Sequence, residues 1–388
     1  MKLLFTAGTA RGGTNFRTLM LNNHPNIRMS LDPFIPLFRF YRDSLLKSVG
    51  QEHLLTQIPS VNALDDYYFS ETKLKIMKAI QSADPDISFD MSYWSELKKA
   101  IASRMELASV NLIPHLDKLP APTFREIFNN TLQVIAATSD KDNLEWVGFN
   151  DNWTMEFFPL IAKLIPDAKF MLHLRDPRAV INSSEFAEPD PTKHPPVITF
   201  ARHLRKYYAF SRFLAEEPVL QNRLLITQYE PCMVDPDKEV RRMTDFLGVN
   251  FSPNMTEIEA FRKADGNPWP SKRDVYQAST DIWREEMPRE MVELTEFICD
   301  PEMRLCGYVP EIYDQELGLS SEALSFTLRN SRESLGWTTD YPEIERMLGG
   351  EFFRKQVLKI KEPPSIEEIE RCFLFENVYH ELKQLKQL

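Results

Sequence analysis

The sequence lacks three features that mark common classes of protein. It contains no apolar run of about 18 residues, which a membrane-spanning helix needs. Its first residues, "MKLLFTAGTA", are too short and too soon interrupted for a signal peptide or membrane anchor. Its four cysteines show no paired spacing typical of metal sites or disulfide frameworks. We therefore expect a soluble, cytoplasmic protein with reduced thiols and no membrane partner.

Positive charge is also scarce. The formal net charge is −11 at pH 7, which argues against general attraction to nucleic acid or to an anionic membrane. Any anion must then be bound by a local site. The 388 residues, 43% of them hydrophobic, suffice for one large domain with appendages or for two domains.

Three segments of the chain predict a strand followed by a helix. "KLLFTAG" (2–8) precedes the helical pattern "NFRTLMLNNH", and "KFMLHL" (169–174) precedes a helix that begins near Pro177. "NRLLITQYE" (222–230) precedes an amphipathic helix that ends at Gly248. This alternation predicts an α/β fold with a mainly parallel central sheet, helices on both faces, and the ligand at the carboxyl ends of the strands.

Two regions interrupt or follow this alternation. Residues 35–140 have helical periodicity and predict a helical insertion over the sheet, whose aromatic residues (Tyr67, Tyr68, Phe69 and Trp94 among them) are more typical of a core than of a pocket. Residues 363–388 predict one amphipathic helix that packs on the body or on a partner subunit. If the chain forms homo-oligomers, we expect this helix at the interface. We divide the chain into a domain of residues 1–310 and a helical C-terminal extension, 311–388.

The stretch "GTARGGTN" (8–15) joins the first strand to its helix. Backbone N–H groups of such a glycine-rich turn, at the positive end of a helix dipole, bind anions and most often phosphate. Gly8 and Gly13 have the spacing of an ATP-binding P-loop, but Thr14 replaces its lysine and Asn15 its magnesium-binding hydroxyl. The pattern therefore disfavours a metal-dependent kinase. Arg11 supplies a forked cation for an anion handled without metal; a solvated arginine on a surface turn is the alternative.

A second candidate phosphate site lies in "HLRDPRAVINSS". Arg175 stands at the end of the predicted strand, and Ser183 follows eight residues later in the next helix. That separation allows both side chains to reach one phosphate at the carboxyl edge of the sheet. We therefore hypothesise that the two candidate sites bind two phosphate groups of one nucleotide.

These residues resemble motifs of the sulfotransferases that use 3′-phosphoadenosine 5′-phosphosulfate (PAPS), most of all the branch with tyrosylprotein and bacterial small-molecule sulfotransferases. "TARGGTNFRTLMLNNHPNIRMSLDPF" resembles the family's 5′-phosphosulfate loop and helix, and "DAKFMLHLRDPRAVINSS" resembles its 3′-phosphate motif. "ITQYEPCMVDPDKEVRRMTDFLGV" and "GNPWPSKRDVYQASTDIWREEMP" are similar to later stretches, the second to the loop that closes over the nucleotide. The likeness covers residues 1–310; the tail has no counterpart.

The resemblance implies a role for each matching residue. Arg175 and Ser183 bind the 3′-phosphate, and Tyr229 lies near the adenine. Lys272 and Arg273 come from the closing loop. PAPS is the co-substrate, 3′-phosphoadenosine 5′-phosphate (PAP) is the product, and no metal takes part. The 5′-phosphosulfate is wrapped by Arg11, Gly12, Gly13, Thr14 and Asn15.

The implied reaction is in-line transfer of the sulfonate to an acceptor oxygen or nitrogen, with a carboxylate as general base. Asp32 stands at the position of the family's catalytic glutamate. The alternative is that Asp32 caps the turn into a helix whose first residue is Pro33. His24 and Pro25 are interpreted as structural, and His173 as a packing residue inside a strand.

One motif departs from the family. Many relatives carry "GEKTP" with the lysine near the transferred group, whereas this chain has "GFNDNW" and places Asn150 at that position. Asn150 can donate one neutral hydrogen bond where a cation is usual, and Asp151 or Asn152 can orient the acceptor. The sequence thus predicts a sulfotransferase with a small-molecule hydroxyl or amine acceptor. A PAP- or PAPS-binding protein without activity and a P-loop nucleotide kinase are the alternatives.

Overall fold

The computed structural model describes residues 1–57, 66–152, 154–187, 196–257, 280–329, 332–334, 337–339 and 341–385. The chain forms two compact units, and neither is continuous in sequence. The first comprises residues 1–63, 76–174 and 214–276, and the second comprises residues 64–75, 175–213 and 277–388. The predicted domain boundary near residue 310 stays a prediction.

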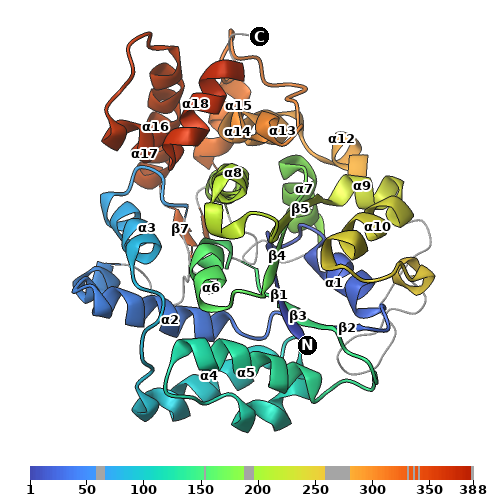
Figure 1. Cartoon of the computed structure of the whole chain (residues 1–388). Coiled ribbons are helices and arrows are strands. Elements are labelled where there is room, and N and C mark those ends of the chain that lie inside the picture. The colour runs from blue at the N-terminus through green and yellow to red at the C-terminus, as the bar shows by residue number, and fades with distance from the viewer. Residues whose placement is uncertain are drawn as a thin grey trace. The chain divides into compact units, whose positions relative to one another are not determined.

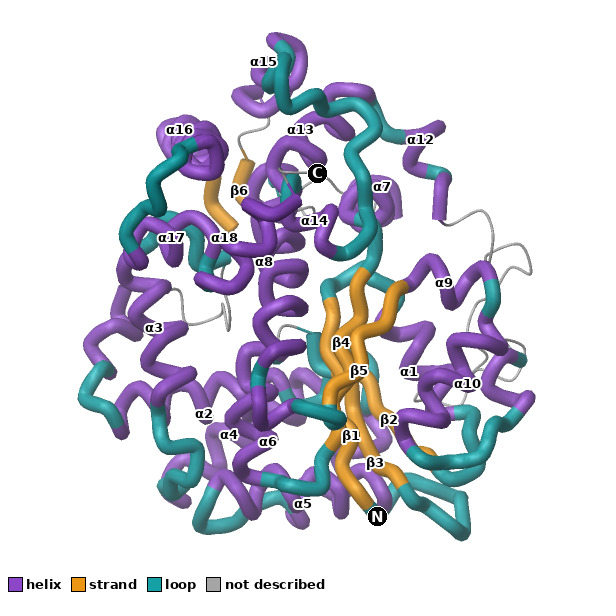
Figure 2. Tube along the Cα trace, turned by 45° about the horizontal axis from the view of Figure 1, so that its top comes forward, coloured by secondary structure: helices purple, strands orange, loops and turns teal. Residues whose placement is uncertain are grey.

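The first unit is built on a five-stranded sheet in which every pairing is parallel. The strands lie side by side (Figure 2), and their hydrogen-bonded order is β2-β3-β1-β4-β5. This sheet confirms the predicted α/β fold and three predicted strands. The other two, β2 and β3, were not predicted. The bounds are β1 (Lys2–Gly8), β2 (Ile27–Leu31), β3 (Trp146–Asn150), β4 (Lys169–Leu174) and β5 (Leu224–Gln228).

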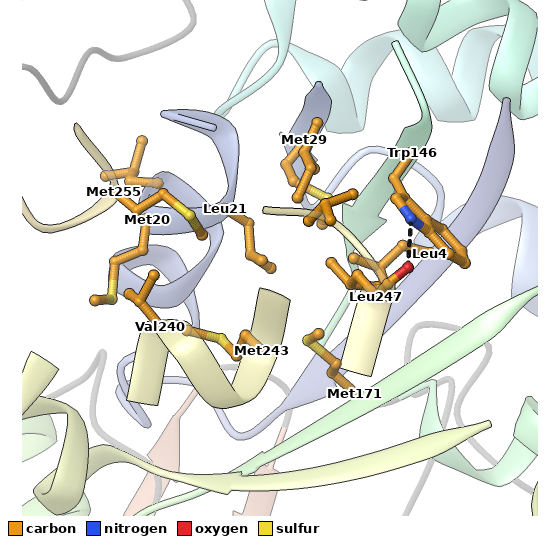
Figure 3. Close-up of a cluster of buried hydrophobic side chains, with 13 residues drawn as sticks. Leu4, Met20, Leu21, Met29, Trp146, Met171, Val240, Met243, Leu247 and Met255 are labelled. Atoms are coloured by element: carbon orange, nitrogen blue, oxygen red, sulfur yellow. Dashed lines mark hydrogen bonds between the residues drawn. The ribbon is translucent and has the colours of Figure 1, made fainter. Parts of the chain in front are cut away.

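Alternating residues of β1 point to opposite faces of the sheet, as the period of a strand requires. Leu4 belongs to a cluster that joins the sheet to α1 (Thr14–Asn22) and α10 (Pro236–Leu247). In Figure 3, Met20 and Leu21 of α1 and Val240 and Met243 of α10 lie in this cluster with Leu4. Helix α10 ends at Gly248, which is left-handed, as predicted.

The opposite face carries an aromatic cluster. The ring of Phe5 stacks on that of Phe170 at a centroid distance of 5.6 Å and meets the edge of Phe149 at 5.2 Å. Phe34, which precedes α2 (Ile35–Ser48), contacts Phe149 at 4.9 Å. Phe128 of α5 (Phe124–Ala136) lies 6.4 Å from Phe5. Helices therefore cover both faces of the sheet. Burial of each ring of this kind stabilises the fold by about 1.5–3 kcal/mol relative to exposure of the ring.

Helices occupy the predicted insertion. Helix α2 packs against α4 (Trp94–Met105), and α5 packs against β2 and β3 (Figure 1). Helix α3 spans Glu71–Ser82. The helical periodicity of the sequence starts earlier, but Tyr67 and Phe69 have left-handed φ angles of 62° and 58°, which a right-handed helix cannot contain. The remaining elements of the first unit are η1 (Glu52–Gln57), η2 (Met91–Tyr93), η3 (Val110–Lys118), η4 (Met155–Phe157), α6 (Phe158–Leu164), η6 (Pro218–Leu220), α9 (Tyr229–Val234) and η7 (Pro253–Thr256).

The second unit is mainly helical and contains a small antiparallel pair, β6 (Arg332–Ser334) and β7 (Trp337–Thr339). Buried ion pairs connect its helices. Arg205 pairs with Glu351, and Arg354 pairs with Glu302. Its helices are α7 (Pro177–Ala187), α8 (Val197–Glu216), α12 (Trp283–Glu286), α13 (Arg289–Cys299), α14 (Glu302–Leu305), α15 (Ser321–Arg329), α16 (Tyr341–Lys359), α17 (Ile366–Phe373) and α18 (Glu376–Leu385).

The C-terminal segment forms two helices, so the prediction of one helix over 363–388 is wrong. Leu374, between α17 and α18, has a φ of 68°, which ends the first helix. The next residue, Phe375, stacks on Phe213 with ring centroids 4.1 Å apart. The helical segment thus breaks next to a buried aromatic ring. A role of the segment at a subunit interface stays a prediction. Within the described residues, no helix combines the length and the apolar character needed to cross a membrane.

Candidate active site

The glycine-rich loop lies between β1 and α1, as predicted. Arg11 and Gly13 have left-handed φ angles of 60° and 84°, and Gly13 is the N-cap of α1. A Cβ at Gly13 would lie 2.2 Å from the ring of Tyr229, and one at Gly12 would lie 2.5 Å from the hydroxyl of Thr9. Both positions therefore need glycine. Gly13, as the N-cap, has no side chain that could cap α1, so the N-terminus of this helix can receive an anion.

The other predicted loop residues differ in exposure. Arg11 is exposed and Asn15 is half-buried, whereas Thr14 is buried. The Thr14 hydroxyl donates a hydrogen bond to Asn152 Oδ1 at 3.2 Å. Tyr229 is the first residue of α9, and its ring is buried next to Gly13. The structure thus places Tyr229 at the loop, although the two lie more than 200 residues apart in sequence.

Asp32 directly follows β2 and is surrounded by hydrogen-bond donors. Its Oδ1 lies 3.5 Å from Asn150 Nδ2 and accepts a bond from the backbone N–H of Asn152 at 3.3 Å. Its Oδ2 is 3.4 Å from a guanidinium nitrogen of Arg104, and Arg104 Nε also donates to the Asp32 carbonyl at 3.2 Å. Arg104 belongs to α4, so the helical insertion supplies the cation beside this carboxylate. No motif in the sequence points to Arg104.

The environment of Asp32 alters its acidity. Burial raises the pKa of its carboxyl group above the usual range, and the charge of Arg104 opposes that rise. Such a carboxylate is a stronger base than an exposed aspartate and is still hydrogen-bonded. The alternative role as a helix cap is wrong. Helix α2 begins at Ile35 with Phe34 as N-cap, and the Phe34 N–H donates to Asp151 Oδ2 at 2.8 Å.

Asn150 lies between the carboxylate of Asp32 and a second arginine, Arg17. Its Oδ1 accepts hydrogen bonds from Arg17 Nη2 at 3.1 Å and from the Thr6 hydroxyl at 3.2 Å. Arg17 is fully buried, and burial lowers the pKa of its guanidinium to about 9. No motif in the sequence points to Arg17. The available signal was an arginine among the apolar positions of the α1 pattern.

The arrangement follows from the register of the sheet. Asn150 pairs with Thr6 of β1 and with Leu31 of β2, so the carboxyl ends of these three strands coincide. Asp32 and Asn152 lie one or two residues beyond those ends. A loop that can receive an anion and a carboxylate that can accept a proton therefore occupy the same edge of the sheet.

Asp151 offers a test of the buried charges at this edge. Burial, and then the nearby Asp32 carboxylate, raises the pKa of Asp151 well above its usual range. Folding therefore favours protonated Asp151, and its contribution to stability falls as pH rises from about 4 through the raised pKa, by at most about 1.4 kcal/mol per pH unit. In Asp151→Asn, whose amide oxygen can still accept the Phe34 N–H, this loss is absent.

We therefore expect the free energy of unfolding of Asp151→Asn, relative to the parent, to increase between pH 4 and pH 8. Urea denaturation at several pH values measures this difference. A difference that stays constant over the range would contradict the raised pKa. Glu156→Gln, at another buried carboxyl group of the same unit, is the comparison variant.

The remaining predicted residues belong to the second unit or lie outside the described residues. Arg175 directly follows β4, is largely buried, and accepts a hydrogen bond at its carbonyl from the Tyr208 hydroxyl at 2.8 Å. Ser183 is half-buried in α7, which begins at Pro177 as predicted. Arg178, the second residue of α7, pairs with Asp176 and Glu296. The two predicted residues of the closing loop, Lys272 and Arg273, lie outside the described residues.

Both histidines have structural contacts. The Nε2 of His24 lies 2.7 Å from the carbonyl of Asn250, and its Nδ1 accepts the Asn26 N–H at 3.0 Å. His173 is buried in β4, with Nδ1 2.8 Å from the Thr227 hydroxyl. These contacts support the interpretation of both as structural residues.

Comparison with known proteins finds sulfotransferases among the relatives of this chain. Over 175 residues the chain is 25% identical to carbohydrate sulfotransferase 3 of Tetronarce californica, covering 40% of this chain and 39% of the relative. Over 227 residues it is 21% identical to protein-tyrosine sulfotransferase A of Caenorhabditis elegans, covering 56% of each. The chain thus matches about half, or less, of these relatives' lengths.

Among solved structures, the sulfotransferase domain from the Synechococcus PCC 7002 olefin synthase has a TM-score of 0.39 at 15% identity, covering 76% of this chain and 94% of that domain. The model of the sulfotransferase family matches residues 4–253. That match includes the loop, Asp32, Asn150 and Arg175. Because it covers more than half of the chain, the protein belongs to the sulfotransferase family.

Proposed function

We propose that the protein transfers a sulfonate group from PAPS to a hydroxyl or amine of a small-molecule acceptor. The observation that carries the proposal is the Asp32 carboxylate, held by Asn150, Asn152 and Arg104 at the strand ends beside the glycine-rich loop. Membership of the family implies PAPS as the donor. The half-buried position and hydrogen bonds of Asp32 suit a general base.

The loop supports the donor half of this proposal. The N-terminus of α1, whose N-cap is a glycine, offers its first backbone N–H groups to an anion. In the proposal, Arg11 and the segment from Gly12 to Asn15 bind the 5′-phosphosulfate, and Tyr229 lies near the adenine. Arg175 and Ser183 bind the 3′-phosphate, and Lys272 and Arg273 close over the nucleotide.

In the reaction, Asp32 accepts the proton of the acceptor as the new bond to sulfur forms. The bond between sulfur and the bridging oxygen of the phosphosulfate breaks, and PAP leaves with the electron pair. Negative charge then develops on the bridging oxygen, where loop N–H groups and Arg11 stabilise it. Asn150 donates a neutral hydrogen bond toward Asp32, and Asn152 fixes the carboxylate through its backbone N–H.

The acceptor class needs its own test, since the two curated relatives are named for carbohydrate and protein-tyrosine acceptors. A screen with sulfur-labelled PAPS should therefore compare small phenols and amines with an oligosaccharide and a tyrosine-containing peptide. We expect label transfer to the small molecules. Label on only the oligosaccharide or the peptide would support sulfonate transfer but contradict the proposed small-molecule acceptor.

Nucleotide selectivity tests the donor directly. We expect calorimetric titration to show that PAP binds the protein, with the same affinity in the presence and absence of magnesium. ATP should bind more weakly, because Thr14 and Asn15 replace the lysine and the magnesium-binding hydroxyl of a P-loop kinase.

Two outcomes separate the alternatives. A preference for magnesium-ATP would favour a nucleotide kinase. Binding of PAP and PAPS without label transfer to any acceptor class would favour a nucleotide-binding protein, for which the neutral Asn150 is the supporting observation.

A further inference from the structure

The guanidinium of Arg17 has an unusual environment. It is fully buried in the first unit, and its Nη2 donates to the neutral amide oxygen of Asn150 at 3.1 Å. Its Nε and Nη1 have no hydrogen-bond partner among the described residues. A buried cation with unpaired N–H groups is costly, because protein interiors normally provide a counter-charge or acceptors.

The surroundings do not supply that counter-charge. Among the described residues, no carboxylate lies within ion-pair distance of Arg17. The ionisable group whose charge acts on Arg17 is the thiol of Cys232, and burial raises the pKa of that thiol to about 12. Cys232 is therefore neutral at pH 7. Among the described residues Arg17 therefore lacks an anionic partner, and an anion that binds the protein can supply one.

The position of Arg17 indicates where that anion binds. Side chains of a helix tilt toward its N-terminus, and Arg17 lies in the first turns of α1, directly after the loop. Its contact, Asn150, reaches on to Asp32 through the amide nitrogen at 3.5 Å and to Asn152 Oδ1 at 3.2 Å. One amide group thus separates the unpaired guanidinium from the candidate base.

We infer that Arg17 is a further substrate-binding residue, whose guanidinium donates hydrogen bonds to oxygens of the donor's sulfonate group. This inference rests on the proposed function. The phosphate of the donor already has the loop N–H groups and Arg11. The sulfonate must lie toward the carboxylate that activates the acceptor. Arg17, whose Nε and Nη1 have no partner among the described residues, is joined to that carboxylate through Asn150.

Calorimetry with PAP and with PAPS tests this assignment, because the two nucleotides differ by the sulfonate. In Arg17→Met we expect the Kd for PAPS to rise about tenfold or more, the loss of one or two hydrogen bonds to a charged group. The Kd for PAP should stay within about threefold, which is below the effect of one such bond. Arg17→Lys, which keeps the charge, should restore part of the affinity for PAPS.

Thermal unfolding distinguishes this role from a structural one. Arg17→Met should be at least as stable as the parent without nucleotide, because it removes a buried charge without a partner. Arg223→Met is the matched control. The guanidinium of Arg223 donates to the carbonyls of Ala162, Ile165 and Ala168, so its loss should lower the Tm and leave both affinities unchanged.

Three results would overturn the assignment. Equal weakening of PAP and PAPS would move the contact from the sulfonate to the rest of the nucleotide. Unchanged PAPS affinity would exclude a contact with the donor. A lower Tm of Arg17→Met without nucleotide would show a structural residue. Failure of the parent to bind either nucleotide is a different result, because it rejects the proposed function and the assignment that depends on it.

Discussion

Replacement of Asp32 by asparagine should lower kcat by about 10²- to 10⁴-fold, the usual contribution of a general base. Asparagine cannot accept the acceptor proton, but it tolerates the left-handed φ of 45° at this position. It can also keep the acceptor oxygen that faces the Asn152 N–H. The loss should therefore appear in kcat with PAPS, measured by label transfer, while PAP affinity and Tm stay close to those of the parent.

The pH profile of the parent provides an independent check. Asp32 acts when it is ionised, so kcat/KM should fall as pH drops through its pKa, and burial places this fall at a higher pH than for an exposed aspartate. Arg104→Gln removes a charge that lowers this pKa, and the fall should then move to still higher pH. An Asp32→Asn variant that retains a third or more of the parent's turnover would contradict the role of general base.

Replacement of Arg175 by alanine should weaken the binding of PAP by about 30-fold or more, because the 3′-phosphate loses a largely buried charged partner. The affinity for adenosine 5′-phosphate, which has no 3′-phosphate, should change much less. Calorimetric titration of both nucleotides measures the difference. The readout is the ratio of the two affinities, which a general loss of folding would leave unchanged.

Ser183→Ala is the milder companion of this variant. Loss of one hydroxyl should reduce PAP affinity in the same direction by about two- to tenfold, the effect of a single hydrogen bond. Equal weakening of both nucleotides in Arg175→Ala would remove Arg175 from the 3′-phosphate site. If Ser183→Ala binds PAP as tightly as the parent does, only the serine is excluded from the 3′-phosphate site.

Local patterns sufficed for much of the fold. β1 and β4 begin and end where their short apolar runs do, and α10 ends at the predicted Gly248. Such signals act over a few residues, through strand periodicity and the freedom of glycine at a left-handed C-cap. β2 and β3 were not predicted because their identity depends on pairing between distant segments: β3 pairs with β1, and β2 pairs with β3.

Errors arose where packing overrides local preference. The C-terminal segment has a continuous helical pattern, yet Leu374 adopts a left-handed φ and Phe375 stacks on Phe213, a residue far away in sequence. The helical pattern before α3 fails at Tyr67 and Phe69 for the same kind of reason, since Tyr67 is buried and both residues are left-handed. Burial of an aromatic ring outweighs one residue's helix propensity.

The sequence by itself determined the glycine-rich loop, the alternation of strands and helices, and the positions of Asp32 and Asn150 within motifs, because these depend on neighbouring residues. Only the tertiary structure brought Arg104 to the Asp32 carboxylate and Arg17 to the Asn150 amide. Those contacts depend on strand register and on the packing of α1 and α4, which join segments far apart in the chain. At Asn150 the sequence indicated a missing positive charge, and the structure places the guanidinium of Arg17 within hydrogen-bond distance of that residue.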